Sequence, residues 1–245
     1  MKGDPGKATD GPVSRLINRP IAVWIARQII RLGLPLTPNQ VSVLAFLLGA
    51  AAASASAMGH YLAAGVLIQA SSVIDGVDGA IARLRGVASR AGGFLDTMLD
   101  RYADILIYLG LTLGPIMEGA ADPLPAIVAL GLGLSGDLMV SYLHVRGERD
   151  SGTHPSLIGP LDSIASRDVR LLLLAAITAA GHPIIAMISA GILGHVYVAV
   201  KSMYLFYYIK REESNVRVDV KKLNHLNHNY GGPGAFDKVR PPGRR

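Results

Sequence analysis

A long uncharged stretch sets the strongest limit on the fold of this chain. No Asp, Glu, Lys or Arg occurs from Leu32 through Ile74, a run of 43 residues. A membrane-spanning helix needs about 20 apolar residues, so the run is long enough for two crossings. The segment Gly59-His60-Tyr61, near its middle, is typical of a turn. Only 17% of the residues are charged, whereas a soluble domain carries about 25%, and a water-soluble globular enzyme is therefore disfavoured.

A second uncharged stretch, Leu171 to Val200, contains the turn signal Gly181-His182-Pro183 and predicts another pair of helices. Two further apolar segments with a few embedded acids lie between the two pairs. We therefore predict an all-α, polytopic membrane protein with six transmembrane helices. Their expected ranges are 40–58, 62–83, 93–117, 121–144, 168–181 and 184–209.

The positions of Lys and Arg predict the orientation. All 24 basic residues fall in the N-terminal segment, the 84–91 loop, the 145–167 loop, the C-terminal tail or the adjoining helix ends. The expected outer turns hold Glu118 and Asp122 but no basic residue. This is the positive-inside pattern. We expect a protein of the cell membrane with both termini and the active site in the cytoplasm, and no nucleic-acid partner for the net charge of +6.

Composition divides the chain into four parts. Residues 1–12 form a polar N-terminal segment, and residues 13–34 mix apolar positions with four arginines. We expect this second part to be an amphipathic helix on the membrane surface, with a solvated cytoplasmic helix as the alternative. Residues 35–211 form the six-helix domain, and residues 212–245 a cytoplasmic, partly disordered tail. Cysteine is absent, which excludes disulfides and thiol nucleophiles.

Four acids lie where a membrane makes them costly. Asp75 and Asp78 are three residues apart, and Asp96 and Asp100 are four apart, so each pair shares one helix face. The short loop between the pairs predicts neighbouring antiparallel helices with both pairs at one depth. Four clustered carboxylates cannot all be ionised without cations. Two divalent ions such as Mg²⁺ would balance them and could bridge a pyrophosphate.

Nearby small and basic residues suit a phosphate-bearing ligand. Small residues allow a ligand to approach the backbone closely, and a fixed arginine can contact phosphate. The alternatives are ordinary helix-packing glycines and an arginine that only signals topology. The residues concerned are Gly79, Ala82, Arg83 and Gly92. For Asp104, an ion pair with Arg101 is an equally good explanation.

Together these residues resemble a known signature. The pattern D-x2-D-G-x2-A-R-x8-G-x3-D-x3-D runs from Asp75 to Asp100 and is similar, at every position, to that of the CDP-alcohol phosphotransferases. The element Thr37-Pro38-Asn39 also resembles the family, and the likeness covers residues 12 to 210. It implies a dimeric membrane enzyme with a polar cavity open to the cytoplasm. Such enzymes displace CMP from a CDP-alcohol by attack of an acceptor hydroxyl on the distal phosphorus.

The resemblance also implies roles for individual residues. Asp75, Asp78, Asp96 and Asp100 would hold two ions of Mg²⁺, with Mn²⁺ as the alternative. Asp100 would in addition be the catalytic base that takes the acceptor proton. The residues expected to bind the CDP part are Pro38, Asn39, Gly79, Ala82, Arg83 and Gly92.

Three further segments narrow the likeness to one branch of the family. Residues Thr9 to Arg19, Asp100 to Asp104 and Ser166 to Arg170 are similar to the transferase domains of di-myo-inositol phosphate phosphate synthases. Those enzymes join CDP-inositol to inositol 1-phosphate and are often fused to a cytidylyltransferase. We expect a separate cytidylyltransferase chain to supply the donor here.

Three basic residues could bind the phosphate of the acceptor. Arg167 and Arg170 lie three apart at the inner end of the fifth span, and Lys201 could join them from the sixth. Paired arginines suit phosphate recognition. The alternative is that these are topology charges that reach the membrane interface.

Three functions stay open at this point. The first is a synthase of a soluble product from CDP-inositol and a phosphorylated polyol. The second is a phospholipid synthase with a CDP-diacylglycerol or CDP-archaeol donor, because a basic acceptor pocket does not identify the donor. The third, a cation-coupled transporter, is disfavoured because the acids lie in one hairpin near one surface and no internal repeat is visible.

Overall fold

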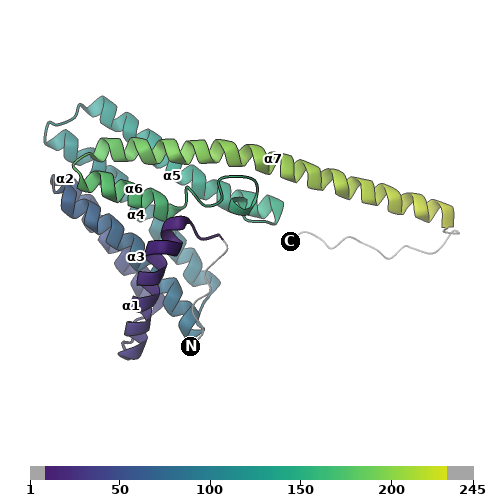
Figure 1. Ribbon diagram of the computed structural model, residues 1–245, viewed down its shortest axis with the longest axis horizontal. Coiled ribbons are helices and arrows are strands. Elements are labelled where there is room, and N and C mark those ends of the chain that lie inside the picture. The colour runs from purple at the N-terminus through teal and green to yellow at the C-terminus, as the bar shows by residue number, and fades with distance from the viewer. Residues whose placement is uncertain (1–8, 231–245) are drawn as a thin grey trace.

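The computed structural model describes residues 9–230, with side chains described as far as residue 215. This part of the chain is all-helical, as expected (Figure 1). Helices lie in or beside all six ranges predicted from the sequence. The elements in chain order are η1 Ser14–Asn18, α1 Arg19–Arg31, α2 Pro38–Ala57, α3 Tyr61–Arg85, α4 Arg90–Met117, α5 Pro123–Ser151, η2 Pro155–Leu157, α6 Arg167–Ala179 and α7 Pro183–Tyr230.

Local signals define the helix ends that later form the site. Helix α2 begins with a capping box, in which Thr37 Oγ1 accepts from the Gln40 N–H and Gln40 Oε1 accepts from the Thr37 N–H. Helix α3 ends at Gly86, whose φ of 69° is the left-handed conformation that favours glycine. Helix α4 begins after Ser89, whose Oγ accepts from the Gly92 N–H at 3.0 Å. A short loop therefore joins α3 to α4.

Helix α2 packs against both α3 and α4, and α5 packs along α7. Small residues permit these close approaches. A Cβ added at Gly110 of α4 would lie 2.5 Å from the Ala53 Cα of α2, so no side chain fits there. Close contact through small residues is the usual way that helices associate in lipid, where burial of apolar surface supplies little driving force.

The N-terminal helices lie across α3 (Figure 1). Ala22 and Ala26 of α1 are buried in a cluster with Val77 and Ile81 of α3. The opposite side of the N-terminal helices exposes large apolar side chains, including Trp24 at 62% exposure. A helix therefore occupies most of the 13–34 range, with its alanines packed inward and its large apolar groups outward.

Four of the described helices are long and apolar enough to cross a membrane: α2, α3, α5 and α7. This supports a membrane protein. Helix α6 has only 13 residues, and α4 contains several acids and arginines, so these two do not meet the same measure of length and composition.

Helix α7 is longer than expected. The polar tail was expected to begin at residue 212, but the helix continues without a break to Tyr230 and extends beyond the other helices (Figure 1). Residues 1–8 of the expected N-terminal segment and residues 231–245 of the expected tail lie outside the described residues.

We expect Gly110→Ala to destabilise the protein by about 1–3 kcal/mol, because its new methyl group would overlap the backbone of α2. Gly131→Ala is the matched control, since a Cβ there meets nothing within 4 Å. Thermal unfolding in detergent would measure both. Equal melting temperatures for the two variants would show that the α2–α4 contact is looser than described.

Candidate active site

Three aspartates from two helices meet at one point. Asp75 lies on α3, and Asp96 and Asp100 lie on α4. One carboxylate oxygen from each lies within 4.8 Å of the others, so the three could hold a metal ion. Hard divalent cations prefer such oxygen ligands. Asp96 Oδ1 is also buried with no hydrogen-bond partner among the described residues, as expected for an atom that faces a cation.

The fourth aspartate, Asp78, lies beside this group rather than inside it. Its carboxylate accepts hydrogen bonds from Ser42 of α2 and from the Gly79 N–H. The carboxyl group of Asp78 also lies close to that of Asp96, and the carboxyl group of Asp75 lies close to that of Asp100. The two acid pairs therefore face each other across the α3–α4 hairpin, which is the arrangement expected from their spacing.

Arg167, the first residue of α6, lies among three carboxylates. Its Nη1 is 3.0 Å from Asp100 Oδ1 and 3.3 Å from Asp75 Oδ2. Its Nη2 is 2.9 Å from Asp104 Oδ1. One guanidinium group thus joins the aspartate site to a deeper carboxylate. Asp104 also pairs with Arg101 at 3.0 Å, so the predicted ion pair is present.

A second buried ion pair lies behind the first. Asp137 of α5 accepts from Arg170 Nε at 2.7 Å and from Arg101 Nη1 at 3.3 Å. Arg170 and Asp137 are each only 1% exposed. Breaking such a pair would leave an uncompensated buried charge. Arg101 therefore connects Asp104 to Asp137, a partner for Asp137 that the sequence alone did not indicate.

The three candidate acceptor residues have different surroundings. Arg167 contacts the aspartates, whereas Arg170 contacts Asp137 and the Ala165 carbonyl. Lys201 of α7 is buried and donates to the carbonyls of Ser156 and Ile158, at 3.2 and 2.8 Å. Arg167 is thus the member of this trio that the described structure places directly on the aspartate group.

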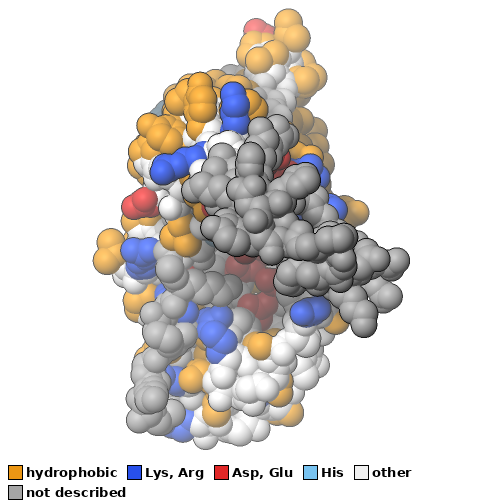
Figure 2. Space-filling view, turned by 90° about the vertical axis from the view of Figure 1, so that its right-hand side faces the viewer, with side chains coloured by type: hydrophobic (Ala, Val, Ile, Leu, Met, Phe, Trp, Pro, Cys, Tyr) orange, Lys and Arg blue, Asp and Glu red, His pale blue; other side chains and the backbone are white. Residues whose placement is uncertain are grey.

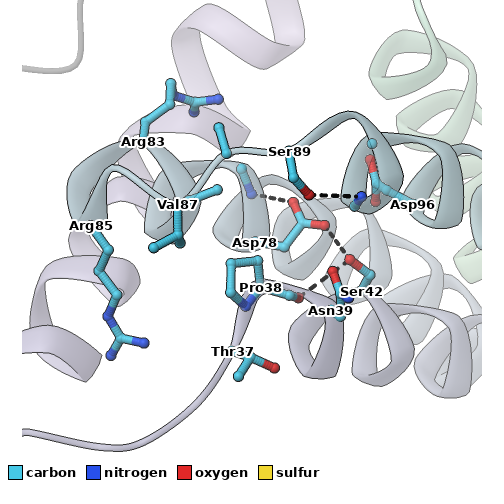
Figure 3. A pocket seen from close by; sticks show the side chains of 15 residues that line it. Thr37, Pro38, Asn39, Ser42, Asp78, Arg83, Arg85, Val87, Ser89 and Asp96 are labelled. Carbon is cyan, nitrogen blue, oxygen red and sulfur yellow. Dashed lines mark hydrogen bonds between the residues drawn. The ribbon is translucent and has the colours of Figure 1, made fainter.

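A cavity of about 540 Å³ opens beside the aspartates. Its lining includes every residue expected to bind CDP: Pro38, Asn39, Gly79, Ala82, Arg83 and Gly92. Figure 3 shows the carboxylates of Asp78 and Asp96 on one side of this cavity and the side chains of Arg83 and Arg85 on the other. The cavity thus has an acidic side for cations and a basic side for an anionic ligand.

The cavity is also lined by residues to which the sequence assigned no binding role: Thr37, Ser42, Arg85, Val87, Ala88, Ser89 and Gly93. Two of them had a detectable signal. Ser42 follows Pro38 by four residues and so lies on the same helix face, and Ser89 is a typical helix N-cap. Arg85 had no such signal in the sequence. Its guanidinium group donates to the carbonyls of Leu34 and Leu36, which are distant in the chain.

The surface near the site has a mixed charge. In Figure 2, acidic side chains are set back from the surface, and Lys and Arg side chains lie around them. Basic groups around a recessed acidic centre would attract an anionic substrate toward bound cations.

Comparison with known proteins agrees with this geometry. Residues 35–206 match the family model described as CDP-alcohol phosphatidyltransferase. The chain is 42% identical over 194 residues to the "Bifunctional IPC transferase and DIPP synthase" of Rubrobacter xylanophilus, covering 79% of this chain and 42% of that protein. It is 32% identical over 205 residues to the "Archaetidylinositol phosphate synthase" of Methanothermobacter thermautotrophicus, covering 81% and 93%. The chain thus spans less than half of the first relative.

A solved structure shares the fold. The phosphatidylinositol phosphate synthase of Mycobacterium tuberculosis, crystallised with CDP-DAG bound, superposes with a TM-score of 0.62 at 24% sequence identity. The match covers 76% of this chain and 94% of that one.

We expect Asp96→Asn to weaken Mn²⁺ binding by at least about tenfold, because it removes one charge and one oxygen ligand from the aspartate group. Electron paramagnetic resonance of free Mn²⁺ would measure the affinity without substrates. Asp150→Asn is the control, since Asp150 pairs with Arg146 and is not part of this group. Unchanged Mn²⁺ affinity in the Asp96 variant would exclude this residue as a ligand.

Proposed function

Since the chain belongs to the CDP-alcohol phosphatidyltransferase family and is a transferase, we propose that it catalyses attack of an acceptor hydroxyl on the distal phosphorus of a CDP-alcohol, with release of CMP. The observation that carries this proposal is the cavity, which adjoins the aspartate group and is lined by residues of the signature segment from Asp78 to Asp96. Membership in this family also removes the transporter alternative.

The family is metal-dependent, and the aspartate group fits a divalent ion. In this proposal Asp75, Asp78, Asp96 and Asp100 would hold two divalent ions, Mg²⁺ with Mn²⁺ as the alternative. When bound, such ions neutralise a pyrophosphate and stabilise the attacking and leaving oxygens. Asp100 takes the acceptor proton, since it lies at the junction of the aspartate group and Arg167.

The nucleotide occupies the cavity of about 540 Å³. Pro38 and Asn39 of α2 contact the CDP part from one wall, and Gly79, Ala82 and Arg83 of α3 from another. Gly92 of α4 keeps the cavity open at this point. A Cβ there would lie 3.3 Å from Asn39 Oδ1 and would narrow the cavity. A side chain at this position would therefore reduce donor binding.

The acceptor is inositol 1-phosphate and the donor is CDP-inositol, which gives di-myo-inositol phosphate phosphate. The names of the two relatives support an inositol phosphate substrate. Arg167 binds the acceptor phosphate, with Arg170 and Lys201 behind it. Because Arg167 contacts Asp100, an acceptor held by this arginine has its hydroxyl near the base. The second candidate is a phospholipid synthase with a CDP-diacylglycerol or CDP-archaeol donor, which the name of the archaeal relative favours.

The proposed membrane arrangement rests on the distribution of charged and apolar residues. All six helices α2 to α7 cross the cell membrane, and the buried charges of α4 and α6 are paired inside the protein. Both termini and the active site face the cytoplasm. Helix α1 lies at the membrane surface, where its exposed Trp24 contacts lipid.

Two partners complete the proposal. The enzyme acts as a homodimer, as the family resemblance implies. A separate cytidylyltransferase supplies the CDP-inositol on which the transferase acts.

Purified protein with Mg²⁺ and inositol 1-phosphate should release CMP from CDP-inositol but not from a CDP-lipid. Release of CMP from the CDP-lipid alone would establish the phospholipid synthase instead.

Asp100→Asn should lower turnover at least about tenfold, because no side chain then takes the acceptor proton. Asp100→Asn with more than about a tenth of the wild-type activity would exclude Asp100 as the base.

Arg167→Ala should raise the acceptor KM by at least about tenfold and leave the donor KM within about twofold, because a charge-assisted phosphate contact is lost. Steady-state kinetics of CMP release, with each substrate varied in turn, would measure both constants. A change in donor KM alone would show that Arg167 serves the nucleotide rather than the acceptor.

A further inference from the structure

One hydrogen-bonded network links the N-terminal helix to the active site. Asn18, at the end of η1, is 2% exposed. Its Nδ2 donates to Asp168 Oδ1 at 2.8 Å and to Ser72 Oγ at 2.9 Å. Its Oδ1 accepts from Gln69 Nε2 at 2.8 Å. Ser72 Oγ in turn donates to Asp168 Oδ1 at 3.0 Å.

The network is specific for an amide at position 18. Both Nδ2 hydrogens of Asn18 have acceptors and its oxygen has a donor, so each polar atom of the side chain has a partner. In a buried site, an unpaired polar group costs more than a hydrogen bond gains. Any residue that reverses one of these polarities would therefore disturb Asp168.

Asp168 follows Arg167 directly on the first turn of α6. On α3, Ser72 and Asp75 are three residues apart and so share one face. Ser72 binds Asp168, and Asp75 pairs with Arg167 at 3.3 Å. The same face of α3 thus receives two successive residues of α6, and the position of one limits the position of the other.

The chain on both sides of this network is held as well. Ser163 Oγ, in the loop before α6, donates to the Thr9 carbonyl at 2.6 Å. Gly11 packs so tightly on this loop that an added Cβ would lie 2.8 Å from Ser166 Cβ. The N-terminal segment and the start of α6 therefore form one contact surface beside the aspartates.

We propose that Asn18 is a positioning residue, which acts through Asp168 to hold Arg167 at the acceptor side of the active site. The N-terminal helix is then part of the machinery for acceptor recognition, although Asn18 itself is buried and does not line the cavity. This inference rests on the proposed function of Arg167 as the acceptor-phosphate ligand.

Asn18→Asp tests the proposal, because it replaces the donating amide with a carboxylate that faces Asp168. We expect the acceptor KM for inositol 1-phosphate to rise at least about tenfold, with the donor KM within about twofold. A purely structural role would reduce the amount of folded enzyme, and so the apparent kcat, without changing the acceptor KM of the folded fraction.

The double variant Asn18→Asp with Asp168→Asn exchanges the two groups. The new carboxylate at position 18 would accept from the new amide at position 168, from Gln69 and from Ser72, so the hydrogen bond between positions 18 and 168 is restored with its direction reversed. We expect its acceptor KM to return to within about threefold of wild type. Restored kinetics require this specific pairing, so the test still works if Asn18→Asp alone does not fold.

Gln28→Glu is the matched control, an amide-to-carboxylate change in the adjoining helix α1. Gln28 lies toward the end of α1, away from Asn18, and its Oε1 accepts from Arg31 Nη1 at 3.4 Å. Both KM values of this variant should equal those of wild type.

The proposal is overturned if Asn18→Asp leaves the acceptor KM within twofold, or if the exchange fails to restore it. An increase caused by Arg167→Ala but not by Asn18→Asp would reject this inference and leave the proposed function intact. An unchanged acceptor KM in Arg167→Ala would reject the acceptor role of Arg167, and this inference with it.

Discussion

The structure depends on how a group of carboxylates is compensated inside an apolar helix bundle. Arg167 contacts Asp75, Asp100 and Asp104 at once, so a single guanidinium group joins the aspartate site to the acid behind it. Ionised groups in such surroundings must be paired, because an isolated buried charge costs several kcal/mol or more. The four signature aspartates, from Asp75 to Asp100, carry more negative charge than Arg167 can balance. This excess charge favours the binding of divalent cations at the same place.

The deeper pairs extend this logic away from the site. Arg101 contacts Asp104 and Asp137, and Asp137 contacts Arg170. These contacts tie α4, α5 and α6 together through charge, in addition to the apolar cluster that the three helices share. They also allow α4 and α6 to carry charged residues within a membrane protein. Their charged groups face protein partners, as intramembrane charges normally do.

The cavity and the N-terminal helix lie beside the aspartate group and are held by different kinds of contact. The cavity is built from helix ends that local signals define: the capping box at Thr37, the left-handed Gly86 and the N-cap Ser89. The acceptor side is built from longer-range contacts, in which Asn18 and Asp168 meet although 150 residues separate them. The helix ends around the cavity are thus set by local signals, although the cavity joins residues from 37 to 96, whereas the contacts of Asn18 join segments still farther apart in the chain.

The sequence by itself determined the helical class, the approximate helix ranges and the signature residues that line the cavity, because these depend on local composition and on residues three or four apart on one helix. Only the tertiary structure decided which charges pair and which polar groups meet. The Asp137–Arg170 pair, the contacts of Lys201 with backbone carbonyls and the Asn18 network all join distant segments. A polar residue carries no local sign of its partner, because the partner is chosen by helix packing and by the cost of leaving buried groups unpaired.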